Sequence, residues 1–417
     1  MIDPLLEEGI LPTFKHLLEQ GFSAHLKTTI PPVTIPSWPC LFSGLTPYQL
    51  GYYWFTHPDK GIFNSYHWRD KAIFSLPSIK SFVLNVPGTY PTWKINGEMI
   101  SGMLSPKFSC YPKNLEESLK NKWIIKGKNI LEIFKAFKMK SEYFLNKLKE
   151  DFELLIYVIR TPDTLSHHAH ENPEQIFRYI DLAYKKIDDF LAKVMESDFD
   201  NLFIFSDHGL RVYKKEFNVE RWLEKEGVLD LGESKIDMLS SLILKIYDLV
   251  RSFSNTNYLK KFYDKITNIF KKEQKNTSVE NEFSTGKKDS SYIQHYNSNV
   301  GGLFLSGKDK KKLTIIEKKL ENEKHVKKVY RPDYKGFPDL FIILQKEYVF
   351  AEKKSFFLTR KRSTINHKEK GMFIAYGKDI ESGKSKSVNY FDIAPTILDL
   401  YDKEFQRKMI GKSLNIS

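Results

Sequence analysis

The first candidate site is an acid–histidine pair at the end of an apolar stretch. Asp207 and His208 follow residues 201–205, a run of aliphatic and aromatic side chains, and Gly209 closes the segment. Carboxylate oxygens and imidazole nitrogens are ligands that suit Zn²⁺ and similar ions. A strand that ends in an Asx turn with a surface histidine explains this dipeptide equally well. The metal interpretation therefore depends on whether further ligands accompany it.

Matching residues occur next to two other apolar segments. Asp163 and His167 come after the run 152–160, and His367 lies just before the run 371–376. Asp163 and His167 are four positions apart, so they share one face if a helical turn begins there. The candidate metal ligands are Asp163, His167, Asp207, His208 and His367.

A threonine supplies the hydroxyl that such a site would use. Pro31 and Pro32 favour an extended chain before Thr34, and Pro36 suits the first turn of a helix. We expect Thr34 to be the N-cap of that helix, where a phosphate would also settle. Metal coordination lowers the pKa of a hydroxyl enough for it to attack phosphorus. An ordinary capping threonine remains the alternative.

The elements that must position these residues alternate between strands and helices. Residues 152–160 and 201–205 are expected strands, and residues 181–195 form an amphipathic helix between them. This order is that of a βαβ unit, and an uninterrupted apolar run is typical of a buried parallel strand. The carboxyl ends of parallel strands form the edge where ligands bind. The sequence therefore predicts an α/β fold with a mostly parallel sheet.

The chain changes character after the second strand. Residues 214–299 include a polar stretch, 271–291, that is rich in Lys, Asn, Ser and Glu and favours a mobile loop. We expect 214–299 to be a cap-like insertion. Residues 1–213 and 300–417 would then form one discontinuous main domain.

Composition limits the class of protein. The 417 residues contain 41% hydrophobic and 14% aromatic side chains, enough for a large packed core. Two cysteines, Cys40 and Cys110, exclude a disulfide framework and a cysteine-based zinc site. No stretch approaches the roughly 20 apolar residues of a membrane span. Acidic residues stand near Met1 where a signal peptide needs bases, so we expect a cytoplasmic protein.

The formal net charge of +13 raises the question of nucleic-acid binding. The excess lies in lysine blocks such as 308–312, which are not interleaved with aromatic residues. A solvated basic surface that favours small anionic substrates explains this pattern better than a specific nucleic-acid site.

The motifs taken in chain order resemble those of the alkaline phosphatase superfamily, and within it the type I phosphodiesterase/nucleotide pyrophosphatase family. The resemblance implies a three-layer sandwich with a mostly parallel central sheet and an inserted cap. It rests on segments 31–38, 85–91, 100–102, 163–167, 206–209 and 392–398, with Ser43, Gly44, Pro47 and His367 before Gly371. The sulfatase branch is disfavoured, because Cys40 is followed by Leu41, Phe42 and Ser43 and not by a Cys-x-Pro-x-Arg motif.

The resemblance also implies roles for the candidate residues. Thr34 matches the nucleophile of a site with two divalent metal ions, zinc in most members and manganese as the alternative. Asp163, His167 and His367 match the ligands of one ion. Asp207 and His208, together with Thr34, match part of the ligand set of the other. The expected substrate is a small phosphodiester or nucleotide pyrophosphate.

One ligand of the family pattern has no match. Family members have a strand ending in Asp-Gly upstream of the segment that resembles residues 2–9, and its Asp shares a metal with the Asp-His pair. Asp3 occupies a different position. We expect either a natural chain that extends upstream of Met1 or a protein that has lost this strand. The first is preferred, because losing an inner strand exposes backbone groups and apolar surface. The second would make the chain a non-catalytic or impaired member that binds a phosphorylated ligand. The sequence does not indicate the oligomeric state.

Overall fold

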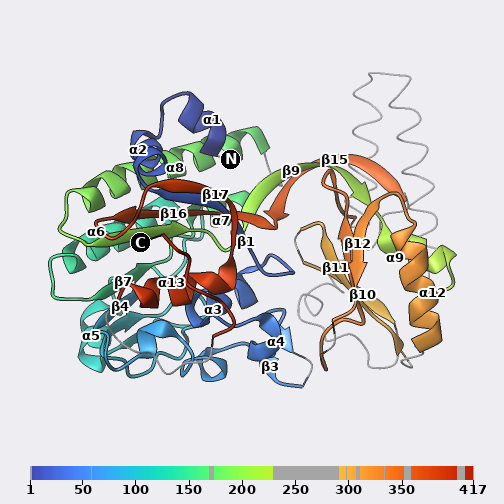
Figure 1. The fold of residues 1–417 in the computed structure, drawn as a ribbon, viewed down its shortest axis with the longest axis horizontal. Coiled ribbons are helices and arrows are strands. Elements are labelled where there is room, and N and C mark those ends of the chain that lie inside the picture. Colours follow the sequence, from blue (N-terminus) through green and yellow to red (C-terminus); the bar gives the residue numbers. More distant parts are fainter. Residues whose placement is uncertain are drawn as a thin grey trace.

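The computed structural model arranges the chain in two parts (Figure 1). One part holds two sheets covered by helices, and the other is a smaller β-rich module joined to it by a long ribbon. The described residues are 2–57, 59–168, 173–228, 291–296, 298–306, 310–332, 334–351, 358–401 and 409–416.

The first sheet joins strands from distant parts of the sequence. β1 is parallel to β17 and antiparallel to β16, and β16 is antiparallel to β8. In spatial order the strands are β17 (Gly383–Asn389), β1 (Phe22–Lys27), β16 (Lys370–Gly377) and β8 (Asn201–Phe205).

β8 corrects one expectation from the sequence. The run 201–205 is a strand as predicted, but it is antiparallel to its neighbour β16 and not parallel. Its five side chains are only partly buried, and within the described residues it has one partner strand. An apolar composition indicates that both faces of a strand are covered, but it carries no information on the direction of the neighbouring strand.

The second sheet contains the parallel part of the fold. β4 pairs in parallel with both β5 and β7, whereas β6 is antiparallel to β5. All four residues of β4 are buried, as expected for the centre of a parallel sheet. In spatial order the strands are β6 (Cys110–Tyr111), β5 (Gly97–Ile100), β4 (Ser81–Leu84) and β7 (Leu154–Tyr157).

The two sheets share the same covering layers. Ile156 of β7 and Phe205 of β8 contribute to one apolar cluster with α3 and α13. Leu155 and Ile204, which point to the opposite face, contribute to a second cluster with α2, α6 and α8. The expected α/β class is therefore confirmed, with helices on both sides of a sheet layer that is divided in two. The helices are α2 (Pro12–Gln20), α3 (Thr34–Ser43), α6 (Ile130–Lys147), α8 (Pro173–Met195) and α13 (Ile393–Asp399).

The N-terminal helical segment is broken where the sequence places Gly9 and Pro12. α1 spans Ile2–Glu7, and α2 begins at Pro12, where the missing N–H of proline is no loss. The buried carboxylate of Asp188 on α8 accepts hydrogen bonds from the N–H groups of Thr13 and Phe14, at 3.1 and 2.8 Å. These bonds satisfy free donors at the helix start and fix α2 against α8.

The smaller module is reached through a two-stranded ribbon. β9 (Gly209–Phe217) is antiparallel to β15 (Thr359–Lys368), and β14 (Tyr348–Phe350) is parallel to β9. Figure 1 shows β9 and β15 running from the main part to the module. Beyond the ribbon lie the antiparallel strands β10 (Tyr292–His295), β11 (Val300–Phe304), β13 (Leu340–Leu344) and β12 (Val326–Tyr330), with α9 (Val219–Lys225) and α12 (Lys310–Glu321).

The module extends past the boundary expected at residue 300. Leu303, Ile316 and Leu340 share an apolar cluster with Trp222 and Leu223, so segments on both sides of that boundary fold together. Most of the expected insertion, including the polar stretch 271–291, lies outside the described residues.

The remaining elements are short. No helix in the described part of the chain is long and apolar enough to cross a membrane. These elements are α4 (Pro47–Leu50), α5 (Lys113–Leu119), α7 (Thr161–Ser166), β2 (Thr56–His57), β3 (Gly61–Ile62) and the 3₁₀ turns η1 (Ser65–His67), η2 (Ile73–Ser75) and η4 (Tyr390–Asp392).

Candidate metal centre

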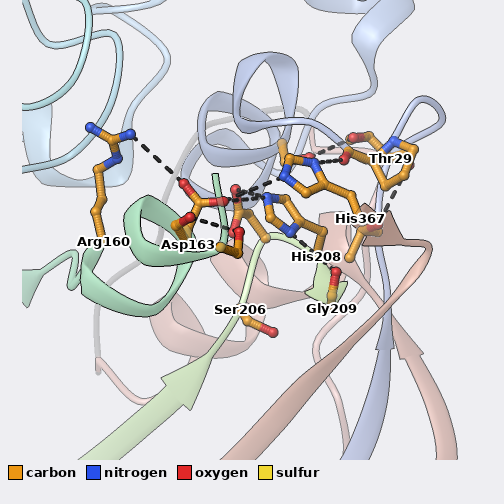
Figure 2. A network of polar contacts seen from close by, with 12 residues as sticks. Thr29, Arg160, Asp163, Ser206, His208, Gly209 and His367 are labelled. Atoms are coloured by element: carbon orange, nitrogen blue, oxygen red, sulfur yellow. Dashed lines mark hydrogen bonds and ion pairs between the residues drawn. The ribbon is translucent and has the colours of Figure 1, made fainter. Parts of the chain in front are cut away.

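The ribbon places two of the predicted histidines side by side. His208 immediately precedes β9, and His367 lies near the end of β15 opposite Leu210. Their rings stack with centroids 3.6 Å apart and planes inclined by 17° (Figure 2). Both side chains are buried. Residues 159 positions apart in sequence thus meet because an antiparallel ladder brings the start of one strand next to the end of the other.

Asp163 completes a group with these histidines. It lies in the first turn of α7, which follows β7. Its Oδ1 atom is 3.4 Å from His367 Nε2 and 3.9 Å from His208 Nε2. Potential ligand atoms of Asp163, His208 and His367 all lie within 4.8 Å of one another, and they form the one such group of three found among the described residues.

A hydrogen bond made by Nδ1 orients the ring of each buried histidine, so that its Nε2 points toward the other candidate ligands. His367 Nδ1 is 3.0 Å from the carbonyl oxygen of Pro32, and His208 Nδ1 is 3.4 Å from that of Gly209. Because a carbonyl can only accept, each Nδ1–H donates and each Nε2 keeps its lone pair. Backbone carbonyls orient metal-binding histidines in this way.

The atoms that face one another in this group have no hydrogen-bond partner. His208 Nε2, His367 Nε2 and Asp163 Oδ1 are all buried, and no described group completes their hydrogen bonding. Buried polar atoms are almost always satisfied, so three such atoms that converge fit a shared cation. One carboxylate and two imidazoles are also a donor set typical of zinc.

The other two predicted ligands lie at the sides of this group. His167 Nε2 is 3.5 Å from Asp163 Oδ1, and its side chain is about half exposed. Asp207 Oδ2 is 3.4 Å from His208 Nε2. The family pattern assigned His208 and Asp163 to different metals, whereas the structure places His208 against Asp163 and His367. The division of the ligands between two ions therefore stays a prediction.

Electrostatics keep the Asp163 carboxyl ionised. Burial by itself would raise the pKa of Asp163, but the contacts with His167 and His367, and the charges of His208 and His367 when these rings are protonated, hold that pKa well below its usual range. In return, contact with Asp163 raises the pKa of His167. Arg160, whose Nη2 is 3.7 Å from Asp163 Oδ2, adds a positive charge on the side away from the stacked histidines (Figure 2).

The buried histidines and Asp207 shift in the opposite sense. Burial lowers the pKa of His208 and of His367, and the neighbouring imidazole lowers that of His367 further. Both rings are therefore neutral at pH 7, the form that binds metals. Burial, together with the charge of Asp163, raises the pKa of Asp207 to about 7. A bound cation would reverse that shift and keep Asp207 ionised.

Thr34 is buried but does not cap its helix. The residue before α3 is Val33, which makes no side-chain cap, and Ile35 has non-helical torsions of φ −111° and ψ 121°. The predicted N-cap role of Thr34 is therefore wrong, since Thr34 lies before a kink and the regular helix begins after Ile35. The bond from His367 to the carbonyl of Pro32 nevertheless ties the Thr34 segment to the metal centre.

Arg160 was not among the residues predicted from the sequence. An arginine at the end of a strand and three positions before a candidate ligand is the only signal the sequence offers for it. Ser206 was also passed over: its Oγ accepts a hydrogen bond from the N–H of Met372 at 2.9 Å. This bond fastens the end of β8 to β16 just before Asp207.

Comparison with known proteins identifies the family. The model of the family described as type I phosphodiesterase/nucleotide pyrophosphatase matches residues 2–356. The chain belongs to this family. The match includes Thr34, Asp163 and the pair Asp207–His208, and it ends before His367. By sequence alone, no curated protein matches the chain.

Solved structures agree with the family assignment at the level of the fold. The murine ectonucleotide pyrophosphatase/phosphodiesterase 5 superposes with a TM-score of 0.54 at 11% identity, over 94% of this chain and 89% of that one. The human protein gives 0.53 at 13% identity with the same coverage. An inactive threonine-to-alanine variant of the murine protein in complex with AMP gives 0.55 at 11% identity, again with the same coverage. The type I phosphodiesterase family, a metal-dependent group, is thus represented here by a chain with a compact cluster of candidate ligands.

Proposed function

We propose that this chain is a metal-dependent hydrolase of phosphodiesters or nucleotide pyrophosphates in which Thr34 is the nucleophile. The observation that carries the proposal is the convergence of three buried, unpartnered ligand atoms from Asp163, His208 and His367. The family supplies the reaction class, and the AMP complex of a structural neighbour supplies the substrate class.

Different residues would hold the metal ions and supply the nucleophile. Asp163, His208 and His367 would hold one divalent ion, zinc or alternatively manganese. His167 and Asp207 extend the ligand set toward a second ion. Bound cations would bring chemistry that this site needs, namely neutralising phosphate oxygens and lowering the pKa of a coordinated hydroxyl. Pro32 holds His367 in the correct tautomer and, two residues further along, the same segment carries Thr34. Thr34, His208 and His367 are all buried.

A second candidate function follows from the charge of the site. Burial and the negative charge of Asp163 raise the pKa of Asp207 to about 7, so this predicted ligand of the second ion is partly protonated at pH 7 unless a cation is bound. If only one ion binds, the chain would retain a phosphorylated ligand without turning it over. This impaired or non-catalytic reading is the alternative to the hydrolase.

The nucleophile is tested with Thr34→Ala. We expect hydrolysis of bis(p-nitrophenyl) phosphate to fall by at least about a thousandfold, since the covalent step loses its attacking oxygen. The circular dichroism spectrum should stay the same. Thr34→Ser keeps a hydroxyl and should retain measurable turnover.

Two outcomes would separate the candidate functions. Parental activity in Thr34→Ala would remove Thr34 from the mechanism. No hydrolysis by the parent protein at saturating zinc or manganese, combined with binding of AMP, would favour the non-catalytic reading.

A further inference from the structure

A small cavity lies next to the metal centre, at the carboxyl ends of β4 and β7. It has a volume of about 50 Å³ and is bordered on one side by apolar residues of α6. One ordered water needs roughly 10–15 Å³ of such space, so the cavity accommodates a few water molecules or one phosphate-sized group, and no nucleoside. Its polar lining includes Asn85, Lys126, Lys140, Arg160, Thr161 and Thr164, and Tyr157 also borders it.

Lys140 is a buried cation that has neutral partners only. Its side chain is 7% exposed, and Nζ donates to Asn85 Oδ1 and to the carbonyl oxygen of Ile125, both at 3.2 Å. Burial, together with the positive charge of Arg160, lowers the pKa of Lys140 to about 8. Within the described residues no carboxylate is paired with it. Burying an ammonium without a counter-charge costs free energy. This cost indicates that the charge of Lys140 has a purpose other than packing.

Two more cations connect the cavity to the metal centre. Arg160 lines the cavity and also reaches Asp163, with Nη2 3.7 Å from Oδ2. Asp163 raises the pKa of His167, and the positive charges of Arg160 and Lys126 act in the opposite direction. Figure 2 shows Arg160 on the opposite side of Asp163 from His208 and His367. The cavity is thus close to the metal ligands but separate from them.

A purely structural role for Lys140 would be to tie α6 to the end of β4. An uncharged donor could make the same two hydrogen bonds to neutral oxygens without the free-energy cost of burying a charge. The ammonium keeps a third proton, and a guanidinium and a second ammonium border the same small space. Three cations around a phosphate-sized volume match a dianion in charge and in size.

We propose that the cavity of Lys126, Lys140 and Arg160 is a binding site for a phosphate-sized dianion beside the metal centre. The dianion is either a second anionic group of a substrate or a free inorganic anion. The site requires neither Thr34 nor a metal ion, so it stands independently of the hydrolase proposal.

The test is a calorimetric titration of sulfate into the chelator-treated protein at pH 7 and low salt. Sulfate keeps two negative charges throughout the pH range used. Because the metal ions have been removed, sulfate cannot bind to them, and the titration measures binding to the cavity. We expect saturable binding with one site per chain. Lys140→Met should weaken it by about tenfold or more, the loss expected for one charge-assisted hydrogen bond.

Two variants control for unrelated effects. Lys138 lies on the same helix with its side chain 76% exposed, so Lys138→Met should bind sulfate as the parent does. Lys126 is exposed in the loop before α6, so Lys126→Gln should fold normally and weaken binding by a smaller factor. Equal affinity in the parent, Lys140→Met and Lys126→Gln would overturn the proposal, as would the absence of saturable binding to the parent.

The dependence on pH separates binding from structural support. Lys140 loses its proton as pH rises through about 8, so sulfate affinity of the parent should fall between pH 7 and pH 9.5. Lys140→Arg keeps its charge and should retain affinity at pH 9.5. A parent and a Lys140→Arg variant with the same pH profile would contradict the proposal.

The source of the anion is found by kinetics on the metal-loaded protein. If the cavity takes a second group of the substrate, Lys140→Met raises KM for a nucleoside diphosphate ester but not for bis(p-nitrophenyl) phosphate. If the cavity takes a free anion, both KM values stay unchanged and inorganic phosphate competes with sulfate in the parent. Lack of competition between phosphate and sulfate, with unchanged KM values, would count against the proposal.

Discussion

The chemistry of single residues explains why Asp163 is central to the site. Among the carboxylates that the structure describes, it alone contacts all three of His167, His208 and His367, at distances between 3.4 and 3.9 Å. Each histidine offers Nε2 to the same oxygen, and the two buried rings hold this orientation through backbone carbonyls. Asp163 is therefore the ligand whose loss should affect the centre most.

Asp163→Asn tests this directly. An amide is a poor ligand for zinc and loses the negative charge that balances the cation, so we expect the metal content per chain to fall by more than half. Elemental analysis after equilibration with limiting zinc measures it. Asp189→Asn, on an exposed face of α8, is the matched control and should leave the content unchanged. Equal stoichiometry in both variants would remove Asp163 from the ligand set.

At the scale of elements, the ribbon β9–β15 determines the position of both buried histidines. Gly209 is the first residue of β9 and directly follows His208. Its backbone packs tightly against neighbouring atoms. A Cβ atom on Gly209 would lie 2.3 Å from the backbone oxygen of Lys370, which cannot move without displacing β16. The close approach of these two backbone segments thus requires a residue without a side chain.

Gly209→Ala should shift the ribbon and separate the two histidines. We expect the melting temperature to fall by about 4 °C or more and zinc affinity to drop by at least about tenfold, the effects of roughly 1–3 kcal/mol of strain. Thermal unfolding with and without zinc provides both values. Gly383→Ala in β17 is the control, since its Cβ would meet Phe22 at an ordinary 3.4 Å. A Gly209→Ala protein that matches this control would show that the ribbon does not depend on the close contact.

At the scale of the whole molecule, the candidate metal centre joins the two parts of the chain. Asp163 belongs to α7 in the main part, whereas His208 and His367 lie on the ribbon that leads to the smaller module. Apolar contacts also join the parts, such as those of Tyr53 with Tyr296 and Phe341. A cation shared by α7 and the ribbon would stabilise the whole arrangement.

Chelation should therefore lower the melting temperature of the parent protein. A ligand at a hundred times its dissociation constant stabilises by about 2.7 kcal/mol, which predicts a change of several degrees on adding a chelator. Added zinc should reverse it. The melting temperature of Asp163→Asn should respond much less to either treatment. A parent protein indifferent to chelator and zinc would show that the cluster binds no stabilising ion.

The sequence by itself indicated the family and much of the local structure. The runs 152–160 and 201–205 contain the strands β7 and β8, and the candidate ligands Asp163, His208 and His367 meet in one region. This success has a physical basis, because apolar runs must be buried and strand ends bring their following residues to an edge.

Only the tertiary structure decided how these pieces are paired. Strands β1, β9, β15 and β17 are too polar to be recognised by apolar pattern, and they become strands because a neighbour completes their hydrogen bonds. The antiparallel direction of β8, the kink that displaces Thr34 from the helix cap and the grouping of His208 with Asp163 have the same origin. Lys140 gives the sharpest example. In the sequence it is one lysine among many, and it becomes a buried charge beside the metal centre only because α6 packs it against the end of β4.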